Sequence, residues 1–500
     1  MVTPRNAVLP VKMLNIPFFG DCIARHPKVP LHPKNVITDK KKNKKMKIKA
    51  MIIATLMTGC PVMVPVAATA KTVVPNDTTA HPHVQKETNK PAGHETKRRL
   101  TIGGYGEAVM TRNFYSDSYL RYTSPESKKD ARSHGRFDLP HVVLYIAYDF
   151  GKGWSMGSEI EFEHGGTESA VEVENEEGGE YESEIERGGE VALEQFWLQK
   201  SFCPQLNLRM GHIIVPVGQT NNHHMPTEFF GVYRPEGENT IMPCTWHETG
   251  ISVWGQTQLW SAESKLRYEV LFVSGLDSER FGSKGWIHDG SASPYEFKIA
   301  NTYAGAARLD FMPVRGMRFS LSGYLGNSFR NTLRETDNGK NDGIKGRVSI
   351  SAFDFAIERR NWIVRGHADY GHLTDAAHIS AFNRQMPQAS PSPHEYVASD
   401  AYAVGIEAGY DVFSTCRKLR EKSQQLFVFG RYDAYDSMYK TQGSTVPYEW
   451  CGRQRVAVGL NYRPLRDIVI KGEYAVGLLG KKFNNEPSVS IGVAYAGFFL

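Results

Sequence analysis

From residue 100 to the end of the chain, apolar and polar residues alternate with a period of two. The last segment shows this most clearly, with one apolar face made of Val489, Ile491, Val493, Tyr495 and Phe499. The opposite face carries small and polar residues, namely Ser488, Ser490, Gly492, Ala494 and Ala496. Such alternation predicts β-strands with one apolar face. Segments of about ten residues with aromatic ends are typical of strands that cross a membrane within a barrel.

Sixteen segments of this kind follow one another along the chain. They are 100–112, 138–149, 154–164, 191–201, 206–215, 249–258, 266–275, 303–312, 317–327, 347–358, 362–372, 402–413, 426–436, 452–463, 468–478 and 488–499. An even number lets the first and last strands of a single-chain barrel close on each other. The pattern therefore predicts an all-β protein, a single transmembrane antiparallel β-barrel of about sixteen strands.

The connections between the segments alternate in length. Tight turns are expected at 151–153, 202–205, 313–316, 359–361 and 464–467. Long polar connections are expected at 165–190, 216–248, 277–302, 328–346 and 373–401. Short periplasmic turns and long external loops produce this alternation in outer-membrane barrels. The connection 414–425 is the exception, because it should be short and is not.

Charged residues of both signs share the face that would point into the barrel. The predicted pore-lining residues are Glu159, Glu161, Arg209, Arg308, Arg318, Arg365, Asp369, Arg431, Asp433, Arg453, Arg455, Lys471 and Glu473. Each Arg or Lys placed in hydrocarbon would cost about 2–4 kcal/mol, whereas a water-filled interior accepts it. The segment 347–358 changes phase near Ala352–Phe355, which we interpret as a bulge, and 191–201 does not sort cleanly.

The longest connection, 216–248, is the third external loop and is rich in aromatic residues and proline. Loops of this length are usually functional. Folded into the lumen, this loop would narrow the pore with His223, His224, Glu228, Arg234, Glu236, Glu238, His247 and Glu248. The alternative is that these charges only keep an external loop soluble. The adjacent histidines point apart in extended chain and no HExxH spacing exists, so we expect no metal site and no cofactor.

The N-terminal region has the features of an export signal. Residues 46–70 combine two lysines, an apolar stretch and a small-residue cleavage site after Ala70. Residues 1–45 then represent an over-extended start, with a basic nucleic-acid-binding arm as the alternative, and 71–99 form a flexible periplasmic leader. A lipoprotein-like box at Cys60 offers a second processing route. Removal of residues 1–70 leaves 59 − 12 = 47 basic against 54 − 2 = 52 acidic residues, so the net charge changes from +5 to −5 and no nucleic-acid partner is expected.

Two further features leave alternatives open. Residues 165–190 contain ten glutamates and one arginine, which is typical of a solvated loop or of a loop that contacts the outer leaflet through divalent cations. The remaining cysteines, Cys203, Cys244, Cys416 and Cys451, could form disulfides between Cys203 and Cys416 and between Cys244 and Cys451, or stay free. The sequence contains neither GxSxG nor a P-loop, and we expect no enzymatic activity.

Several motifs resemble the phosphate-selective (O and P type) porin family of Gram-negative bacteria. They are Gly103-Gly104-Tyr105-Gly106, the run from Gly211 to Gly218, and Glu228-Phe229-Phe230 followed by Arg234-Pro235-Glu236. The resemblance covers most of residues 100–500 and implies a sixteen-stranded barrel, a homotrimer and a third loop inside the pore. Phosphate selectivity itself does not carry over, because the third loop has one Arg, no Lys and four Glu, a balance of 1 − 4 = −3. The final Leu500 also departs from the terminal aromatic residue that is usual in such barrels.

These observations predict an outer-membrane porin for passive diffusion of small, hydrophilic, charged solutes. Its partners would be outer-membrane lipid, lipopolysaccharide and two further copies of the chain. A non-conducting surface barrel that acts as an adhesin or binds a partner protein is the alternative. A barrel enzyme would need a polar cluster on the outward face near the rim, and the predicted lipid-facing positions contain none.

Overall fold

A computed structural model describes residues 99–128, 133–165, 172–175, 181–184, 191–293, 297–332, 341, 343–388, 390 and 392–500. The predicted start, the signal peptide and all but the last residue of the leader lie outside these ranges. Among the described residues, no helix has the length and apolar character needed to span a membrane.

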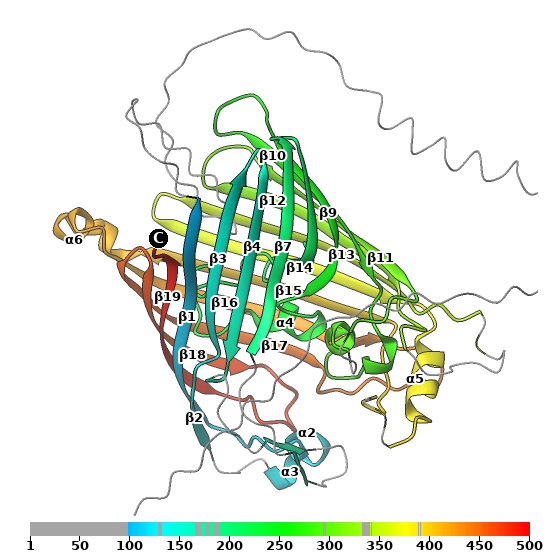
Figure 1. Cartoon of the computed structure of the whole chain (residues 1–500). Helices are drawn as coiled ribbons and strands as arrows, with labels where there is room; N and C mark the ends of the chain where they lie inside the picture. Colours follow the sequence, from blue (N-terminus) through cyan, green and yellow to red (C-terminus); the bar gives the residue numbers. More distant parts are fainter. Residues whose placement is uncertain are drawn as a thin grey trace, which may run out of the picture. The chain divides into compact units, whose positions relative to one another are not determined.

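The predicted closed antiparallel barrel of sixteen strands is confirmed, and each predicted segment corresponds to one strand (Figure 1). The first eight strands are β1 (Leu100–Asn113), β3 (His141–Gly151), β4 (Trp154–Glu163), β7 (Val191–Cys203), β8 (Leu206–Ile214), β9 (His247–Gln258), β10 (Lys265–Ser274) and β11 (Tyr303–Met312). The other eight are β12 (Met317–Asn327), β13 (Arg347–Arg359), β14 (Trp362–Leu373), β15 (Asp400–Asp411), β16 (Gln425–Lys440), β17 (Gly452–Leu465), β18 (Ile468–Gly477) and β19 (Ser488–Phe498).

The barrel closes where its first and last strands pair. β1 runs antiparallel to β19, with Gly103 opposite Phe498 and Asn113 opposite Ser488. The other edge of β1 pairs with β3 and, beyond it, with the short strand β2 (His134–Asp138). Since each of these sixteen strands has a partner on both sides, the wall of the barrel has no free edge on which another chain could add a strand.

Alternate residues along the strands face inside and outside. The outer surface carries exposed apolar side chains along the middle of the strands, including Leu144, Val270, Leu321, Ile406, Leu460 and Ile491. Aromatic residues stand near the short-turn end, including Trp154, Phe202, Trp260 and Trp362. An apolar belt with aromatic residues at its borders matches the outer surface of a barrel in a lipid bilayer.

Two strands differ from the simple pattern, one as predicted and one not. β7 sorts poorly because its register against β4 shifts between Glu159 and Ile160, where one extra residue of β7 is accommodated. The bulge predicted near Ala352–Phe355 is wrong, because β13 pairs without a shift on both sides. Its apolar residues change face instead, since Val348 and Ile350 point inward and pack in the core formed by the loops.

The connections agree with the predicted alternation of short turns and long loops. The exceptional connection between β15 and β16 is occupied by a 3-10 turn, Val412–Thr415, and helix α6, Arg417–Glu421. A two-stranded hairpin of β5 (Glu172–Asn175) and β6 (Tyr181–Glu184) lies in the acidic connection. Other short helices are α2 (Leu120–Thr123), α3 (Pro125–Lys128) and α5 (Ala376–Arg384).

The long loops contribute to an apolar core at their end of the barrel. Trp286, Phe281, Phe329, Ile379 and Trp450 come from four different connections and are buried in one cluster. Strand residues such as Leu271 and Val273 extend this cluster into the barrel. The loops at this end are therefore packed against one another.

Candidate functional site

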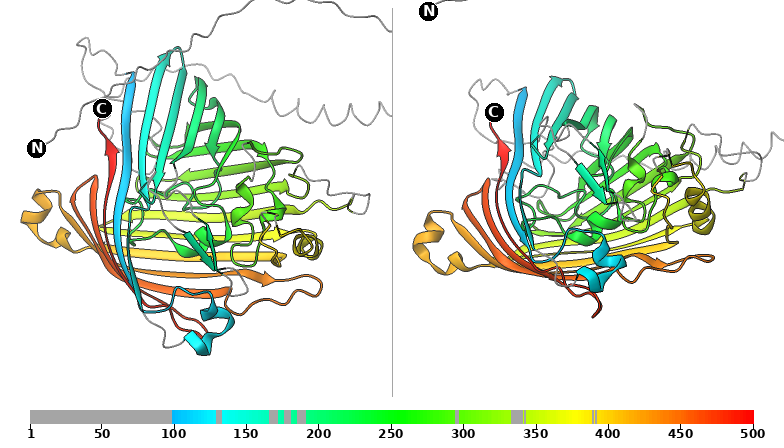
Figure 2. Two further views of the ribbon diagram at one scale, coloured as in Figure 1. Left: turned by 60° about the horizontal axis from the view of Figure 1, so that its bottom comes forward. Right: turned by 90° about the horizontal axis from the view of Figure 1, so that it is seen from below.

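The third loop, here residues 215–246, connects β8 to β9 and lies on the inner side of the strands (Figure 2). Its helix α4 (Glu236–Ile241) packs against β15 and β16. Gly218 has a φ of 80°, and a Cβ there would stand 2.1 Å from Glu238 Oε1, so this turn requires glycine. The predicted loop limits need one correction, because His247 and Glu248 belong to β9 rather than to the loop. Register with β8 continues through both residues.

Phe230 is the apolar anchor of the loop. Its side chain is fully buried, with ring centroids 5.2 Å from Phe427 and 5.5 Å from Phe429 on β16. The carbonyl oxygen of Phe230 accepts a hydrogen bond of 3.0 Å from Asn461 Nδ2 on β17. A Cβ on Gly409 would meet the Phe230 ring at 2.4 Å, so β15 provides space for the ring only through a glycine. The tip of the loop is thus packed into the wall opposite its own ends.

Glu236, at the start of α4, connects the loop to β16 and β17. Its Oε1 accepts a hydrogen bond of 2.6 Å from the hydroxyl of Tyr435. Its Oε2 lies 3.4 Å from Arg455 Nε, and Oε1 lies 3.8 Å from Arg453 Nη1. One carboxylate of the loop therefore meets two guanidinium groups of the wall, which are pore-lining residues predicted from the sequence.

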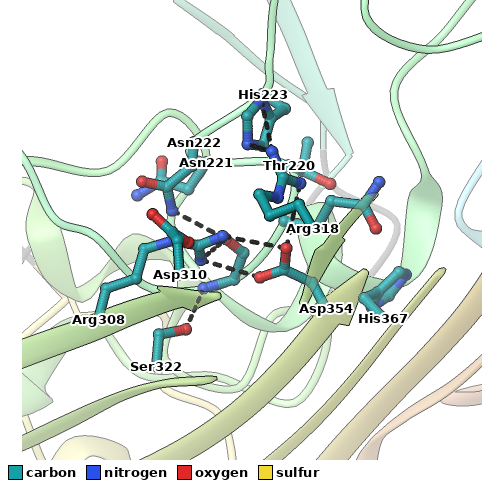
Figure 3. Close-up of polar contacts among 12 residues, drawn as sticks. Thr220, Asn221, Asn222, His223, Arg308, Asp310, Arg318, Ser322, Asp354 and His367 are labelled. Atoms are coloured by element: carbon teal, nitrogen blue, oxygen red, sulfur yellow. Dashed lines mark hydrogen bonds and ion pairs between the residues drawn. The ribbon is translucent and has the colours of Figure 1, made fainter. Parts of the chain in front are cut away.

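His223 faces a charged group on β11 to β13 (Figure 3), and Glu228 lies beside His223. His223 hydrogen-bonds Arg318 and lies 3.2 Å from Glu228 Oε1 through its Nδ1. Arg318 Nη2 is 3.2 Å from Asp354, which also holds Arg308 at 2.8 Å. Burial raises the pKa of Glu228 to about 7, against the opposing effect of nearby arginines.

His224 and Arg234 lie near the acidic part of the wall on β4 and β7. His224 Nδ1 is 3.2 Å from the carbonyl oxygen of Asn221, and its ring contacts Tyr105 edge-on. Arg234 Nε donates to the carbonyl oxygen of His224 at 3.3 Å. Burial lowers the pKa of His224 to about 4, so the ring is neutral at pH 7. The neighbouring His247, on β9, lies 3.4 Å from Glu194.

The last two candidates, Glu248 and Glu238, are buried and accept hydrogen bonds. Glu248 on β9 is buried and accepts hydrogen bonds from Lys298 Nζ at 3.0 Å and from Trp246 Nε1 at 3.2 Å. Glu238 accepts from the backbone of Gln219 and Thr220 at 2.5 and 2.7 Å. Neither carboxylate is the solvated side chain of an external loop.

The predicted pore-lining residues all lie on the inner face, and most are paired. Arg365 contacts Glu407 at 2.8 Å, and Arg431 lies 3.2 Å from Asp433. Lys471 Nζ lies 3.9 Å from the centroid of Phe229, a loop residue. Inward acids not singled out from the sequence are Glu107, Glu194, Glu269, Asp310, Asp354 and Glu407. Their positions in the alternation were the signal that could have found them, and they offset the arginines across the inner wall.

A cavity of about 40 Å³ remains between the loop and the wall formed by β3, β4, β7, β8 and β10. Its lining combines charge and aromatic rings: Tyr145, Glu159, Gln195, Trp197, Arg209, Ile214, Pro216, Asn222, Arg267 and Glu269. Arg209 lies over Trp197, with its guanidinium carbon 4.7 Å from the ring centroid. This volume has room for a few water molecules, since one needs about 10–15 Å³.

The four cysteines within the described residues are free thiols in this structure. Cys203 and Cys416 are exposed, Cys244 is partly buried in the loop, and Cys451 is buried. Burial raises the pKa of Cys244 to about 12, so this thiol stays protonated near neutral pH. Neither of the two conceivable disulfides is formed.

Comparison with known proteins gives one sequence relative and several barrels. An uncharacterized protein of Aquifex aeolicus (strain VF5) is 25% identical over 387 residues, which cover 76% of each chain. No protein-family model matches the chain. The family suggested by the sequence motifs is therefore not shown.

Among solved structures, this chain is similar to outer-membrane channels at low sequence identity. The outer-membrane channel DcaP of Acinetobacter baumannii aligns with a TM-score of 0.43 and 11% identity, over 81% of this chain and 100% of that one. An anion-selective porin from Comamonas acidovorans gives 0.41 and 9%, over 80% and 99%. Salmonella typhi OmpF gives 0.46 and 10%, over 80% and 97%. At these scores the likeness adds nothing to the barrel already evident in the strand pairing.

Proposed function

We propose that this chain is an outer-membrane porin through which small, hydrophilic, charged solutes diffuse passively, past a constriction formed by the third loop. The observation that carries the proposal is the position of this loop, which is bound to the inner wall at Phe230, Glu236 and His223. A loop fixed across a barrel narrows the passage without blocking it, and the charges at the constriction select which ions pass. Neither catalysis nor a cofactor is part of the proposal.

The charged lining supports a polar passage rather than an apolar one. Arg308, Arg318 and Asp354 form one buried group, and similar pairs follow on β14 and β16. Buried charges persist where they are paired or hydrated. Because most arginines have an acidic partner, the lining offers no uncompensated basic track, and we do not assign phosphate as the solute.

The outer surface supports a place in a lipid bilayer. Its apolar belt and aromatic borders would contact lipid, and the loops at the other end would contact lipopolysaccharide. The homotrimer implied by the resemblance to phosphate-selective porins is retained as part of the proposal.

The proposal is tested by single-channel recording of the refolded 71–500 protein in planar bilayers. Stepwise openings, in groups of three for a trimer, are expected, and the reversal potential in a salt gradient gives the ion preference. Folding is checked separately by the shift in gel mobility on heating. A folded barrel that shows no openings would refute the porin function.

One observation favours the alternative of a non-conducting barrel that binds a partner through its loops. Residues of several long loops pack together in the cluster with Trp286 and Trp450. Closure of the mouth of the barrel by these loops would abolish conductance in the recording described above. It also predicts that the folded barrel retains a partner protein from the surface of a host or neighbouring cell, and that loss of the loops abolishes this binding.

A further inference from the structure

A buried cluster of one histidine and two carboxylates joins the third loop to the barrel wall. Glu238 comes from α4, whereas His367 and Asp369 come from β14. The three residues are 2%, 6% and 3% exposed. Each can place one ligand atom within 4.8 Å of the ligand atoms of the other two.

The two acids of the cluster have no Arg or Lys partner among the described residues. In the described part of the chain, neither Glu238 nor Asp369 has an ion pair with Arg or Lys, and only His367 faces Asp369. Two neighbouring acids differ in this respect, since Asp354 has Arg308 and Arg318, and Asp433 has Arg431. Two buried carboxylates beside one imidazole carry an uncompensated charge, which is costly unless a cation or a proton joins them.

His367 and Asp369 meet at the ring nitrogen Nδ1. This nitrogen lies 2.6 Å from Asp369 Oδ2, and because a carboxylate oxygen only accepts, a proton or a cation must lie between the two atoms. With Nδ1 as the metal-binding nitrogen, His367 and Asp369 face the same ion. Asp369 Oδ1 is buried without a hydrogen-bond partner, so this carboxylate has an oxygen available for a cation.

The other ring nitrogen, Nε2, is buried without a hydrogen-bond partner and faces β15. A Cβ built on Gly405, on the neighbouring strand β15, would stand 2.3 Å from His367 Nε2 and 2.9 Å from Asp433 Oδ1. In Figure 3, His367 stands beside the group formed by Arg308, Arg318 and Asp354. Asp354 is its direct partner across the sheet, but its charge is already balanced by the two arginines.

Glu238 is also held in a fixed orientation. Its Oε1 accepts from the backbone nitrogen of Gln219 at 2.5 Å, and its Oε2 accepts from Thr220 N at 2.7 Å and Thr220 Oγ1 at 2.5 Å. Each carboxylate oxygen has two lone pairs, so Oε1 keeps a free one for a cation. Hydrogen bonds that orient a ligating carboxylate are typical of metal sites.

We propose that Glu238, His367 and Asp369 bind a divalent transition-metal ion that fixes α4 of the third loop to β14. One imidazole nitrogen and two carboxylate oxygens suit Zn²⁺ or a similar ion better than Mg²⁺ or Ca²⁺, which prefer oxygen ligands alone. A charge of +2 balances the two carboxylates. The loop sequence alone contains no metal-binding motif, and the site forms only when the loop and the wall each contribute ligands.

A second cluster of the same composition serves as the control. His141, Glu161 and Glu163 also bring ligand atoms within 4.8 Å of one another. In this cluster His141 Nδ1 is 2.6 Å from Glu161, but His141 and Glu163 are partly exposed, and none of the three has a buried atom without a partner. We therefore expect this cluster to be solvated and to bind Zn²⁺ weakly.

The test is equilibrium dialysis of the folded barrel in detergent against Zn²⁺ after treatment with EDTA, with metal per chain measured by mass spectrometry. We expect one Zn²⁺ per chain at micromolar free metal, a loss of affinity of about tenfold or more in His367→Ala and Asp369→Asn, and unchanged binding in His141→Ala. Co²⁺ substitution should give a visible absorption band that depends on His367.

Several outcomes would overturn the site. They are absence of binding by the wild-type barrel, binding that survives in both β14 variants, and loss of binding only in His141→Ala. Asp369→Asn keeps the size of the side chain and covers the case in which His367→Ala fails to fold, which gel mobility on heating reveals. Metal binding is measured without conductance, so a barrel that conducts but binds no Zn²⁺ overturns only this inference.

Discussion

Replacement of Phe230 by alanine should release the tip of the third loop from the wall. The ring is fully buried between Phe427 and Phe429, and Arg365 stacks 5.2 Å from its centroid. Removal of a buried Phe side chain costs about 3–5 kcal/mol. With 1.4 kcal/mol per factor of ten, the ratio of docked to undocked loop tip falls by about 10²–10⁴. The barrel strands keep all their pairing, so the loss acts on the loop and not on the fold.

Single-channel recording of Phe230→Ala should show larger and noisier openings than the wild type. The matched control is Phe353→Ala, which removes the same side chain from the outward face of β13, where the ring is 39% exposed. The control should fold and conduct as the wild type does. If Phe230→Ala folds normally and its conductance and noise equal those of the wild type, the third loop does not set the width of the passage.

Three further predictions concern charge, pH and thiols. Glu236→Gln should raise the preference for anions over cations about fourfold, because a unit charge about 5 Å from an ion contributes about 0.8 kcal/mol in water. Reversal potentials in a KCl gradient measure this preference, and an unchanged ratio of anion to cation permeability would place Glu236 away from the ion path. Burial raises the pKa of Glu228 from its ordinary value of 4.5 to about 7 in the folded state, so the unfolded chain releases this proton at a lower pH than the folded chain does. Wild-type stability should therefore fall as the pH rises from about 4.5 to 7 and level off above it. Glu228→Gln should lack this component when thermal unfolding is compared across that range, and identical pH profiles for the two proteins would contradict it. A thiol reagent should label four cysteines in the denatured, unreduced 71–500 protein, and fewer than four would indicate a disulfide. In the folded barrel, only the exposed Cys203 and Cys416 should react quickly.

The strands could be predicted from the sequence because each carries its own evidence. Alternation is a local property, and a residue such as Leu460 faces outward for the same reason wherever its strand lies in the barrel. The failure at Ala352–Phe355 shows the limit of this reasoning. There the inner face becomes apolar because Val348 and Ile350 meet a core built by distant loops, and a local pattern attributes that change to a bulge.

The candidate site could be predicted only in part from the sequence, for the same reason. Long length and mixed composition marked the third loop as functional, and its charged residues were identified from the sequence alone. Their partners were not, because Glu236 meets arginines on β17 and Glu238 lies beside His367 on β14, both far along the chain. Spacing within the loop therefore argued against a metal site, although the chemistry of a site shared by two elements does not depend on spacing in either one.

The position of the loop follows from its partners in the wall, and these are distributed over nearly half of the barrel. His223 is bound on β12, Phe230 on β16 and β17, and Glu236 on β17, so the loop is held at separated points rather than at one hinge. Loss of a single contact therefore changes the path locally, whereas loss of the whole loop would expose the paired charges of the inner wall. Some of those charges are balanced within the wall, as Arg308 and Arg318 are by Asp354, and their pairing does not require the loop. Arg455, in contrast, is paired with Glu236 of the loop. Under the proposed function, the wall provides a polar lumen and the loop sets the width of that lumen. Variants of the loop should therefore alter conductance and selectivity while folding of the barrel is preserved.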